Sequence, residues 1–232
     1  MIKTVIIHGQ SHKGSTYHIA HKLGEKIGGQ YTDLFLPKDF GEFCTGCTQC
    51  IFYDEKKCPH YDQLRMITAT LDAADVIILA SPVYVFHATG AMKALLDHYA
   101  YRWMAHRPEP SMFQKQGVCI TTAAAAGMKS ACKDMTDSMF YWGIPKIYKL
   151  GFAVSASDWN EISDDIKQDI EKKIASVATK ITEWNGYVKP GLKTKLMFSF
   201  MRRFQIDNQY NKLDQKYWEA HGWLDDKRPW KP

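Results

Sequence analysis

The sequence predicts an α/β protein in which helices cover both faces of a five-stranded parallel sheet, a doubly wound arrangement. Five short apolar runs alternate with helical patterns over residues 1–185. The runs are apolar at most positions instead of at every second one, which is typical of strands buried on both faces. With 232 residues, the chain is long enough for one such domain and an extension, and a core of this size needs no disulfides.

The element boundaries follow from the apolar spacing and from the residues that end helices. We expect strands at residues 5–7, 31–36, 75–80, 117–122 and 146–153. The first helix begins near Ser15, carries apolar residues at every fourth position (Ile19, Leu23 and Ile27), and ends at Gly28. Further helices are expected at residues 61–73, 90–101, 129–141 and 160–184, and a loop at residues 37–59.

Residues 9–16, GQSHKGST, connect the first strand to the first helix. The first amides of a helix have no intrahelical acceptor and lie at the positive end of the helix dipole, so they bind anions. Ser11, Ser15 and Thr16 add hydroxyl donors, and Gly14 lets the backbone approach a ligand. The loop lacks both the Gly-Lys-Ser/Thr of nucleoside triphosphatases and the Gly-x-Gly-x-x-Gly of dinucleotide sites. It therefore predicts a cradle for a single phosphate group, with an ordinary capped turn as the alternative.

Two further loops are expected to join this cradle. In open parallel sheets, ligands bind beyond the carboxyl ends of the strands, where the strand order reverses. Residues 9–16, 81–87 and 121–127 each follow a predicted strand, so we expect them to form one site. His12 and His87 lie in these loops, where either a ligand contact or simple packing would explain them.

The composition of the second and third loops suits a flat ring. Pro82 fixes the turn and leaves the following amides free, and Tyr84 offers a ring for stacking. The small residues that follow Thr121 and Thr122, up to Gly127, leave room for a heterocycle beside the backbone. A phosphorylated, planar ligand is indicated. Flavin mononucleotide (FMN) fits better than a nucleoside triphosphate, which would require a lysine and acidic metal ligands. Plain loop packing of Tyr84 is the alternative.

Four of the six cysteines lie close together: Cys44, Cys47, Cys50 and Cys58. The first three are separated by two residues each, and the fourth follows after seven more, directly before Pro59. Four thiolates in a short loop can hold a [4Fe–4S] cluster, and they equally suit a tetrahedral zinc ion. Free thiols that pack or cross-link reversibly are the third alternative. This spacing indicates a reducing compartment, and we expect Cys119 and Cys132 to be inert, buried thiols.

Three motifs together resemble a known family: GQSHKGST at 9–16, CTGCTQC at 44–50 with Cys58, and SPVYVFHATGAMKALLDH at 81–98. On these motifs, residues 1–185 resemble the flavodoxin-like NAD(P)H-dependent FMN reductases, in particular the iron–sulfur flavoproteins. The resemblance implies strand order 2-1-3-4-5, bound FMN, and a homodimer or homotetramer with cofactor sites near subunit interfaces. It also implies that the FMN phosphate is bound by Ser11, Lys13, Ser15 and Thr16. The flavin ring would be contacted by Pro82, Val83, Tyr84 and Val85. One departure is His98, where relatives commonly carry arginine.

Residues 188–232 differ in composition from the domain that we expect at residues 1–187. Residues 193–204 mix basic with large apolar side chains and contain no acid, and a second helix is expected at 208–220. A basic amphipathic helix can bind an anionic membrane surface. We favour docking on the chain's own domain or on a second subunit, because the many aromatic residues would otherwise be exposed. Membrane contact by this extension is therefore not expected.

Charge and hydropathy limit the choice of partners and compartment. A net charge of +5 is mild, suits small anionic ligands, and does not by itself suggest nucleic acid, which we do not expect as a partner. No apolar run approaches the roughly 20 residues of a membrane span. The chain enters a strand at once, without a signal-peptide pattern, so we expect a cytoplasmic protein.

These observations predict an FMN-dependent oxidoreductase that takes a hydride from NAD(P)H. No protein residue is assigned a catalytic role, because the flavin carries the chemistry. The electrons would pass to a flavin, a quinone or another small acceptor, through an iron–sulfur cluster if the cysteines hold one. A non-catalytic flavoprotein that carries electrons between protein partners is the alternative. A binding protein of the same fold, held together by zinc, is the third hypothesis.

Overall fold

The computed structural model describes residues 1–156 and 158–231. Its sheet has five parallel strands in the order β2-β1-β3-β4-β5. The strands are β1 (Lys3–His8), β2 (Gln30–Phe35), β3 (Val76–Pro82), β4 (Gln116–Ala123) and β5 (Lys146–Ala153). Every strand lies within two residues of its predicted bounds, and the predicted flavodoxin-like strand order is confirmed.

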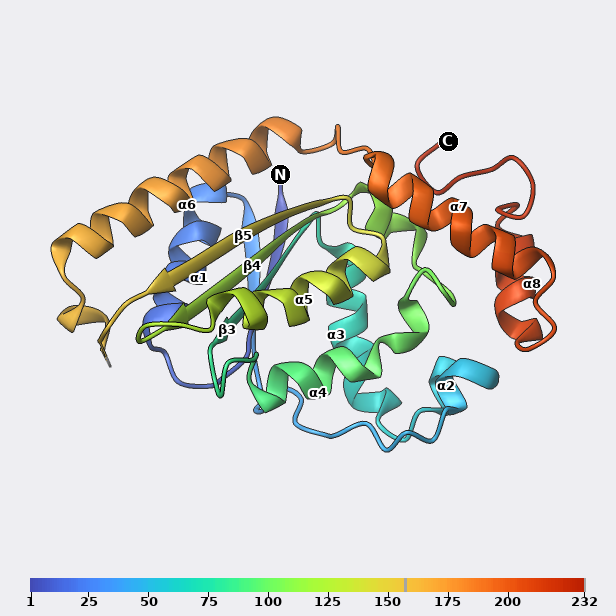
Figure 1. The fold of residues 1–232 in the computed structure, drawn as a ribbon, viewed down its shortest axis with the longest axis horizontal. Helices are drawn as coiled ribbons and strands as arrows, with labels where there is room; N and C mark the ends of the chain where they lie inside the picture. The colour runs from blue at the N-terminus through green and yellow to red at the C-terminus, as the bar shows by residue number, and fades with distance from the viewer. Residues whose placement is uncertain (157, 232) are drawn as a thin grey trace.

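Helices cover both faces of the sheet (Figure 1). One face carries α1 (Ser15–Ile27) and α6 (Asp164–Trp184), and the other carries α3 (Tyr61–Ala73), α4 (Gly90–His98) and α5 (Met128–Trp142). Because successive side chains of a strand point to opposite faces, β1 contributes to both cores. Its Ile6 packs with the α1 and α6 side chains, whereas Val5 and Ile7 pack on the side of α3, α4 and α5.

Three helices differ from their predicted bounds by three or four residues. The helix expected at residues 208–220 begins at Lys212. The helix expected to reach residue 101 ends at His98, and the 3-10 turn Ala100–Arg102 follows it. The helix expected from residue 160 begins at Asp164, because the 3-10 turn Trp159–Glu161 precedes it. A third such turn, Pro110–Gln114, leads into β4.

The strand order reverses between β1 and β3. From β1 the chain moves to the edge strand β2 and then returns to β3, on the other side of β1. The loops after β1 and β3 therefore leave the sheet beside the point at which open α/β sheets bind ligands.

The cysteine-bearing segment 37–59 is more ordered than the predicted loop. It contains the short helix α2 (Gln49–Phe52) and the 3-10 turn Glu55–Lys57. In Figure 1 this segment passes below α4, and α2 lies near α8.

The C-terminal extension forms α7 (Leu192–Ile206) and α8 (Lys212–Ala220). Three of its side chains, Phe198, Trp218 and Trp223, are buried against Met104 and Phe113 of the preceding domain. The rings of Phe198 and Trp218 are stacked, with centroids 4.7 Å apart. The extension therefore docks on its own domain. Within the described ranges, no helix combines the length and apolar character needed to cross a membrane.

Candidate functional site

The loops after β1, β3 and β4 meet at the carboxyl edge of the sheet. The Thr16 and Thr122 hydroxyls lie 2.6 Å apart, which joins the first loop to the third. The amide of Val83 donates to the carbonyl of Thr122 over 2.8 Å, which joins the second loop to the third. The Tyr84 hydroxyl donates to Oε1 of Gln10 over 2.8 Å, so the second loop also contacts the first. The convergence of these loops, expected from the strand ends alone, is present in the fold.

The beginning of α1 is open toward this junction. Gly14 is the N-cap residue, and no side chain caps the first amides of the helix. Ser15 and Thr16 are buried at this end, whereas Ser11 is exposed and its hydroxyl donates to the carbonyl of Leu36 over 3.3 Å. Free amides at a helix start, with hydroxyls beside them, suit a phosphate group. None of the three loops contains a carboxylate that would repel it.

Lys13 differs from the other predicted phosphate contacts. Its ammonium group lies over the ring of Tyr17, 5.1 Å from the centroid, and 5.7 Å from the ring centroid of Phe35. The amine therefore lies on the β2 side of the loop in this structure. It adds positive charge near the cradle from that side.

The second loop presents an exposed apolar surface. Tyr84, Val85 and Phe86 are all exposed, and Pro82 and Val83 are half-buried. Val85 and Phe86 adopt positive φ angles of 49° and 65°, which L-residues rarely adopt. Reciprocal backbone hydrogen bonds between Tyr84 and His87 close this tight turn. Two adjacent strained residues at a loop tip are typical of ligand-binding segments.

The third loop contributes through two of its three predicted residues. Thr122 meets the first loop, as described above, and Gly127 lies against the second. A Cβ atom at Gly127 would come within 2.6 Å of Cγ1 of Val83, and its φ is +97°. Thr121 belongs to the opposite face of β4, because its hydroxyl lies close to Gly151 and has no described hydrogen-bond partner.

Three residues that hold these loops were not predicted. Asp134 of α5 accepts a hydrogen bond from the amide of Ala88 and lies 3.1 Å from Nδ1 of His87. Gln10 holds the Tyr84 hydroxyl, and the Thr89 hydroxyl donates to the carbonyl of Gly9. Thr89 also caps α4, which its position before a helical pattern could have indicated. Asp134 and Gln10 act across the fold, so local sequence gives no signal for them.

The four cysteines of segment 44–58 are all free thiols. Cys44 and Cys47 are exposed, and Cys50 and Cys58 are half-buried. Burial, followed by the proximity of the other three thiols, raises the pKa of Cys50 to about 11. The thiols of Cys44, Cys47 and Cys58 therefore lie close enough to Cys50 to affect its ionisation. Among the described residues, no three of these sulfurs lie within 4.8 Å of one another, a wider spacing than a single zinc ion requires. A [4Fe–4S] cube is larger than a single ion and takes thiolates that lie farther apart.

A buried ion pair fixes the cysteine loop to the extension. Arg107 donates to the carbonyls of Cys50 and Ile51 and to the carboxylate of Asp214 in α8. Nδ2 of Asn211 also donates to the carbonyl of Ile51, over 2.9 Å. A guanidinium group thus lies against the backbone of the cysteine loop, where its charge would stabilise bound anionic sulfur. No local sequence pattern indicates this connection.

His98 links two helices beside the fourth cysteine. Its Nδ1 donates to the carbonyl of Ala94 over 2.7 Å, so its Nε2 accepts from Nδ1 of His60 over 2.9 Å. Burial lowers the pKa of His98, which keeps the ring neutral for this arrangement. Donor atoms of Cys58, His60 and His98 all lie within 4.8 Å of one another. The departure at position 98 therefore has a packing role between α3 and α4.

Cys119 and Cys132 are buried as expected, and His8 also packs inside the fold. Nε2 of His8 lies 2.7 Å from Oδ1 of Asp33, and its ring stacks on Phe35. Both cysteines are buried, and Sγ of Cys119 lies 3.6 Å from the carbonyl oxygen of Cys132.

Comparisons with known proteins identify relatives of this chain. The model of the NADPH-dependent FMN reductase family matches residues 2–158. An iron–sulfur flavoprotein of Archaeoglobus fulgidus is 29% identical over 143 residues, which cover 61% of this chain and 59% of that protein. An iron–sulfur flavoprotein of Methanocaldococcus jannaschii is 41% identical over 54 residues, which cover 23% of this chain and 27% of that protein. The chain thus spans about three-fifths or less of the length of these relatives.

Solved structures share the fold. A flavone reductase superposes with a TM-score of 0.59 at 14% identity, over 82% of this chain and 66% of that one. An FMN-dependent NADH-azoreductase of Bacillus anthracis, in complex with FMN, gives a TM-score of 0.58 at 11% identity, over 78% of this chain and 99% of that one. With the family model matching more than half of its residues, the chain belongs to the NADPH-dependent FMN reductase family.

Proposed function

We propose that the chain is an FMN-dependent oxidoreductase that takes a hydride from NAD(P)H. The observation that carries this proposal is the open, uncapped start of α1, which lies where the loops after β3 and β4 converge. Such a site pairs a phosphate cradle with an exposed apolar surface, and FMN has a phosphate group and a flat ring. When bound, FMN would accept the hydride and deliver electrons onward.

The residues of the chain would bind and orient the cofactor. The amides and hydroxyls of Ser15 and Thr16 would hold its phosphate, with Ser11 and Lys13 at the margin of the cradle. Tyr84 and its neighbours Pro82, Val83 and Val85 would contact the ring and exclude water from one face of it. The hydrogen bond from Tyr84 to Gln10 would keep this surface in place. Gly127 allows the second and third loops to approach each other.

The four cysteines would hold a [4Fe–4S] cluster. Three observations support this: their spacing, the proximity of the four thiols, and the name iron–sulfur flavoprotein carried by the relatives. The guanidinium of Arg107, against the backbone of Cys50, would offset part of the negative charge of the cluster. Free thiols are the alternative, and an iron and sulfide assay of protein purified without oxygen decides between them.

The acceptor would be a small molecule such as a flavin or a quinone, and the enzyme would act in the cytoplasm as a homodimer or homotetramer. Exposed Tyr84, Val85 and Phe86 at the site, and exposed Leu196 and Phe200 on α7, are apolar surfaces that a second subunit could cover. The alternative, a non-catalytic electron carrier, would share the cofactors but would need a separate reductase.

Steady-state oxidation of NADH and NADPH tests the proposal. FMN-loaded protein with menadione as acceptor should oxidise at least one nicotinamide over many turnovers. Flavin that is reduced only when a separate reductase is added would indicate the carrier. Protein that neither retains FMN nor oxidises either nicotinamide would exclude the enzyme.

A further inference from the structure

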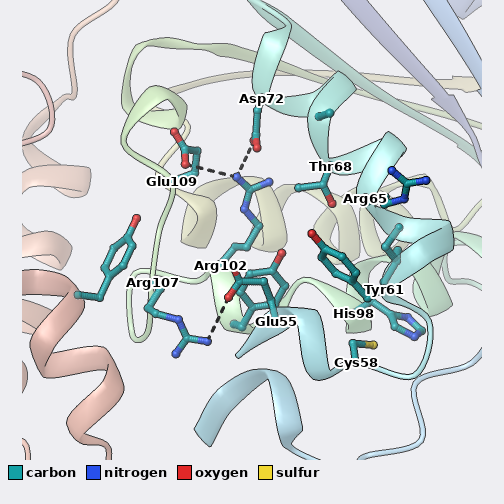
Figure 2. A pocket seen from close by; sticks show the side chains of 14 residues that line it. Glu55, Cys58, Tyr61, Arg65, Thr68, Asp72, His98, Arg102, Arg107 and Glu109 are labelled. Carbon is teal, nitrogen blue, oxygen red and sulfur yellow. Dashed lines mark hydrogen bonds and ion pairs between the residues drawn. The ribbon is translucent and has the colours of Figure 1, made fainter. Parts of the chain in front are cut away.

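A cavity of about 310 Å³ lies beside α3 (Figure 2). Its walls come from α3, from residues 98–109, from the turn Glu55–Lys57 and its neighbour Cys58, and from α8. Among the described residues that line it, none belongs to the loops after β1, β3 and β4. Binding sites for small molecules have volumes of roughly 300–1,000 Å³, so this cavity has room for a small ligand.

The cavity contains a buried donor that has no acceptor. Arg102 is 5% exposed, and its Nη2 lies 2.5 Å from Oδ1 of Asp72 and 3.9 Å from Oε2 of Glu109 (Figure 2). Its other terminal nitrogen, Nη1, is buried and has no hydrogen-bond partner in the described part of the chain. Buried donors in proteins are almost always satisfied. The Nη1 group of Arg102, which belongs to a residue that lines the cavity, is therefore free to donate a hydrogen bond to an acceptor oxygen.

The neighbouring residue offers a second donor. Tyr101 lines the cavity, and burial raises the pKa of its hydroxyl, which therefore keeps its proton as a donor. The guanidinium carbon of Arg107 lies 5.9 Å from the centroid of the Tyr101 ring. Tyr61 and Tyr217 also line the cavity, so that much of its wall is aromatic. Tyr217 belongs to α8, and its own hydroxyl is engaged with the carbonyl of Pro108.

The charges that line the cavity cancel. Arg65, Arg102 and Arg107 are balanced by Glu55, Asp72 and Glu109. Such a wall has no formal surplus of positive charge to select a carboxylate or a phosphate. A neutral ligand with an acceptor oxygen and a flat ring matches the donors, the aromatic wall and the charge balance together.

We propose that this cavity binds a small, neutral compound with a flat, conjugated ring and a carbonyl oxygen. The oxygen accepts hydrogen bonds from Nη1 of Arg102 and from the Tyr101 hydroxyl, while the ring packs against the tyrosines. Because Tyr217 comes from α8, the C-terminal extension completes this site. The proposal concerns binding alone and does not depend on whether the flavin site is catalytic.

Isothermal titration of FMN-loaded protein with tetramethyl-1,4-benzoquinone tests this inference. The probe is small and neutral, carries two carbonyl groups, and has no free ring position for thiol addition. We expect saturable binding that Tyr101→Phe weakens about three- to tenfold, the effect of one lost hydrogen bond. Tyr187→Phe, which removes an exposed hydroxyl outside the cavity, should leave binding unchanged. Benzoate, a similar ring with a negative charge, should bind more weakly than the quinone.

The same titration separates this cavity from the flavin site, where a quinone can also stack. Ala69→Phe places a large side chain on the cavity wall and should abolish the binding event that Tyr101→Phe weakens. Tyr84→Ala, in the flavin loop, should not affect that event. The inference is overturned if no binding is detected, if binding is lost only in Tyr84→Ala, or if benzoate binds more tightly. Unchanged thermal unfolding of Tyr101→Phe confirms that the variant is folded.

Discussion

The substitution Asp214→Ala should destabilise the protein and release the cysteine loop. Asp214 is 1% exposed, and its carboxylate pairs with Arg107. It also lies 2.7 Å from Nδ1 of His106 and 2.9 Å from Nδ2 of Asn211. Removing one member of a buried ion pair costs about 3–5 kcal/mol, because the other charge stays buried. Arg107 keeps Glu55 at 4.0 Å, so we expect the lower end, about 3 kcal/mol.

The loop should respond because Arg107 connects it to α8. Without Asp214, the guanidinium group is free to turn away from the carbonyls of Cys50 and Ile51. Urea unfolding measures the loss of stability, and tryptic cleavage after Lys56 or Lys57 measures the release of the loop. Cleavage there should become faster in Asp214→Ala than in the wild type under native conditions.

The matched control is Asp226→Ala, which removes an exposed acid from the same extension. It should change the free energy of unfolding by less than about 0.5 kcal/mol. A loss below about 1 kcal/mol in Asp214→Ala, with unchanged tryptic cleavage, would refute the buried pair as the connection between the extension and the loop.

Three further predictions concern the flavin loops, the alkaline limit of stability and the cysteines. Gly127→Ala should destabilise the protein by about 1–3 kcal/mol and weaken FMN binding at least fivefold in a fluorescence titration, because φ is +97° and Val83 blocks the new Cβ atom. Burial raises the pKa of Tyr99 to about 12, above its unfolded value near 10. The folded state therefore favours the protonated hydroxyl of Tyr99, and its contribution to stability is complete below about pH 10. As the pH rises from 10 toward 12, the free energy of unfolding measured with urea should fall by up to about 1.4 kcal/mol per pH unit. Cys50→Ser should lower the iron content of protein purified without oxygen, because it removes one of four cluster ligands.

Each of these predictions has a control. Gly186→Ala has the same backbone strain, with φ +78° and open space around it, so it should destabilise the fold without weakening FMN binding. Equal FMN affinities of wild type and Gly127→Ala would contradict the close approach of the loops. In Tyr99→Phe, the free energy of unfolding should fall less steeply above pH 10 than in the wild type. An equally steep fall would show that other groups cause it. Cys132→Ser changes a cysteine outside the cysteine loop and should leave the iron content unchanged. If Cys50→Ser contains as much iron as the wild type, the four cysteines are free thiols.

The sheet was predictable because burial on both faces leaves a local trace. The run Val5–Ile6–Ile7 in β1 and residues 76–80 in β3 are apolar throughout, and glycines such as Gly28 end helices. The convergence of the loops after β1, β3 and β4 was predictable for a related reason, since parallel strands place their carboxyl ends at one edge. Contacts within that edge follow from strand alternation, which turns Thr122 toward Thr16 and Thr121 away from it.

The remaining features depend on residues far apart in the sequence. Arg107 meets Asp214 across 107 positions, and Arg102 meets Asp72 across 30, with no periodic pattern to indicate either pair. The cysteine loop was expected to be irregular, but it contains the short helix α2. The N-cap residue of this helix, Thr48, adopts a left-handed backbone conformation. Charged pairs inside a fold are set by packing, which local spacing does not encode.

The central claim is that the start of α1 recognises the phosphate of FMN. Flavin-free protein titrated with FMN and with riboflavin, which lacks the phosphate, tests it most directly by quenching of flavin fluorescence. We predict that FMN binds at least a hundredfold more tightly than riboflavin, because several hydrogen bonds to a dianion are lost together. Equal affinities would contradict the phosphate cradle, and binding of neither flavin would contradict the assignment of the site.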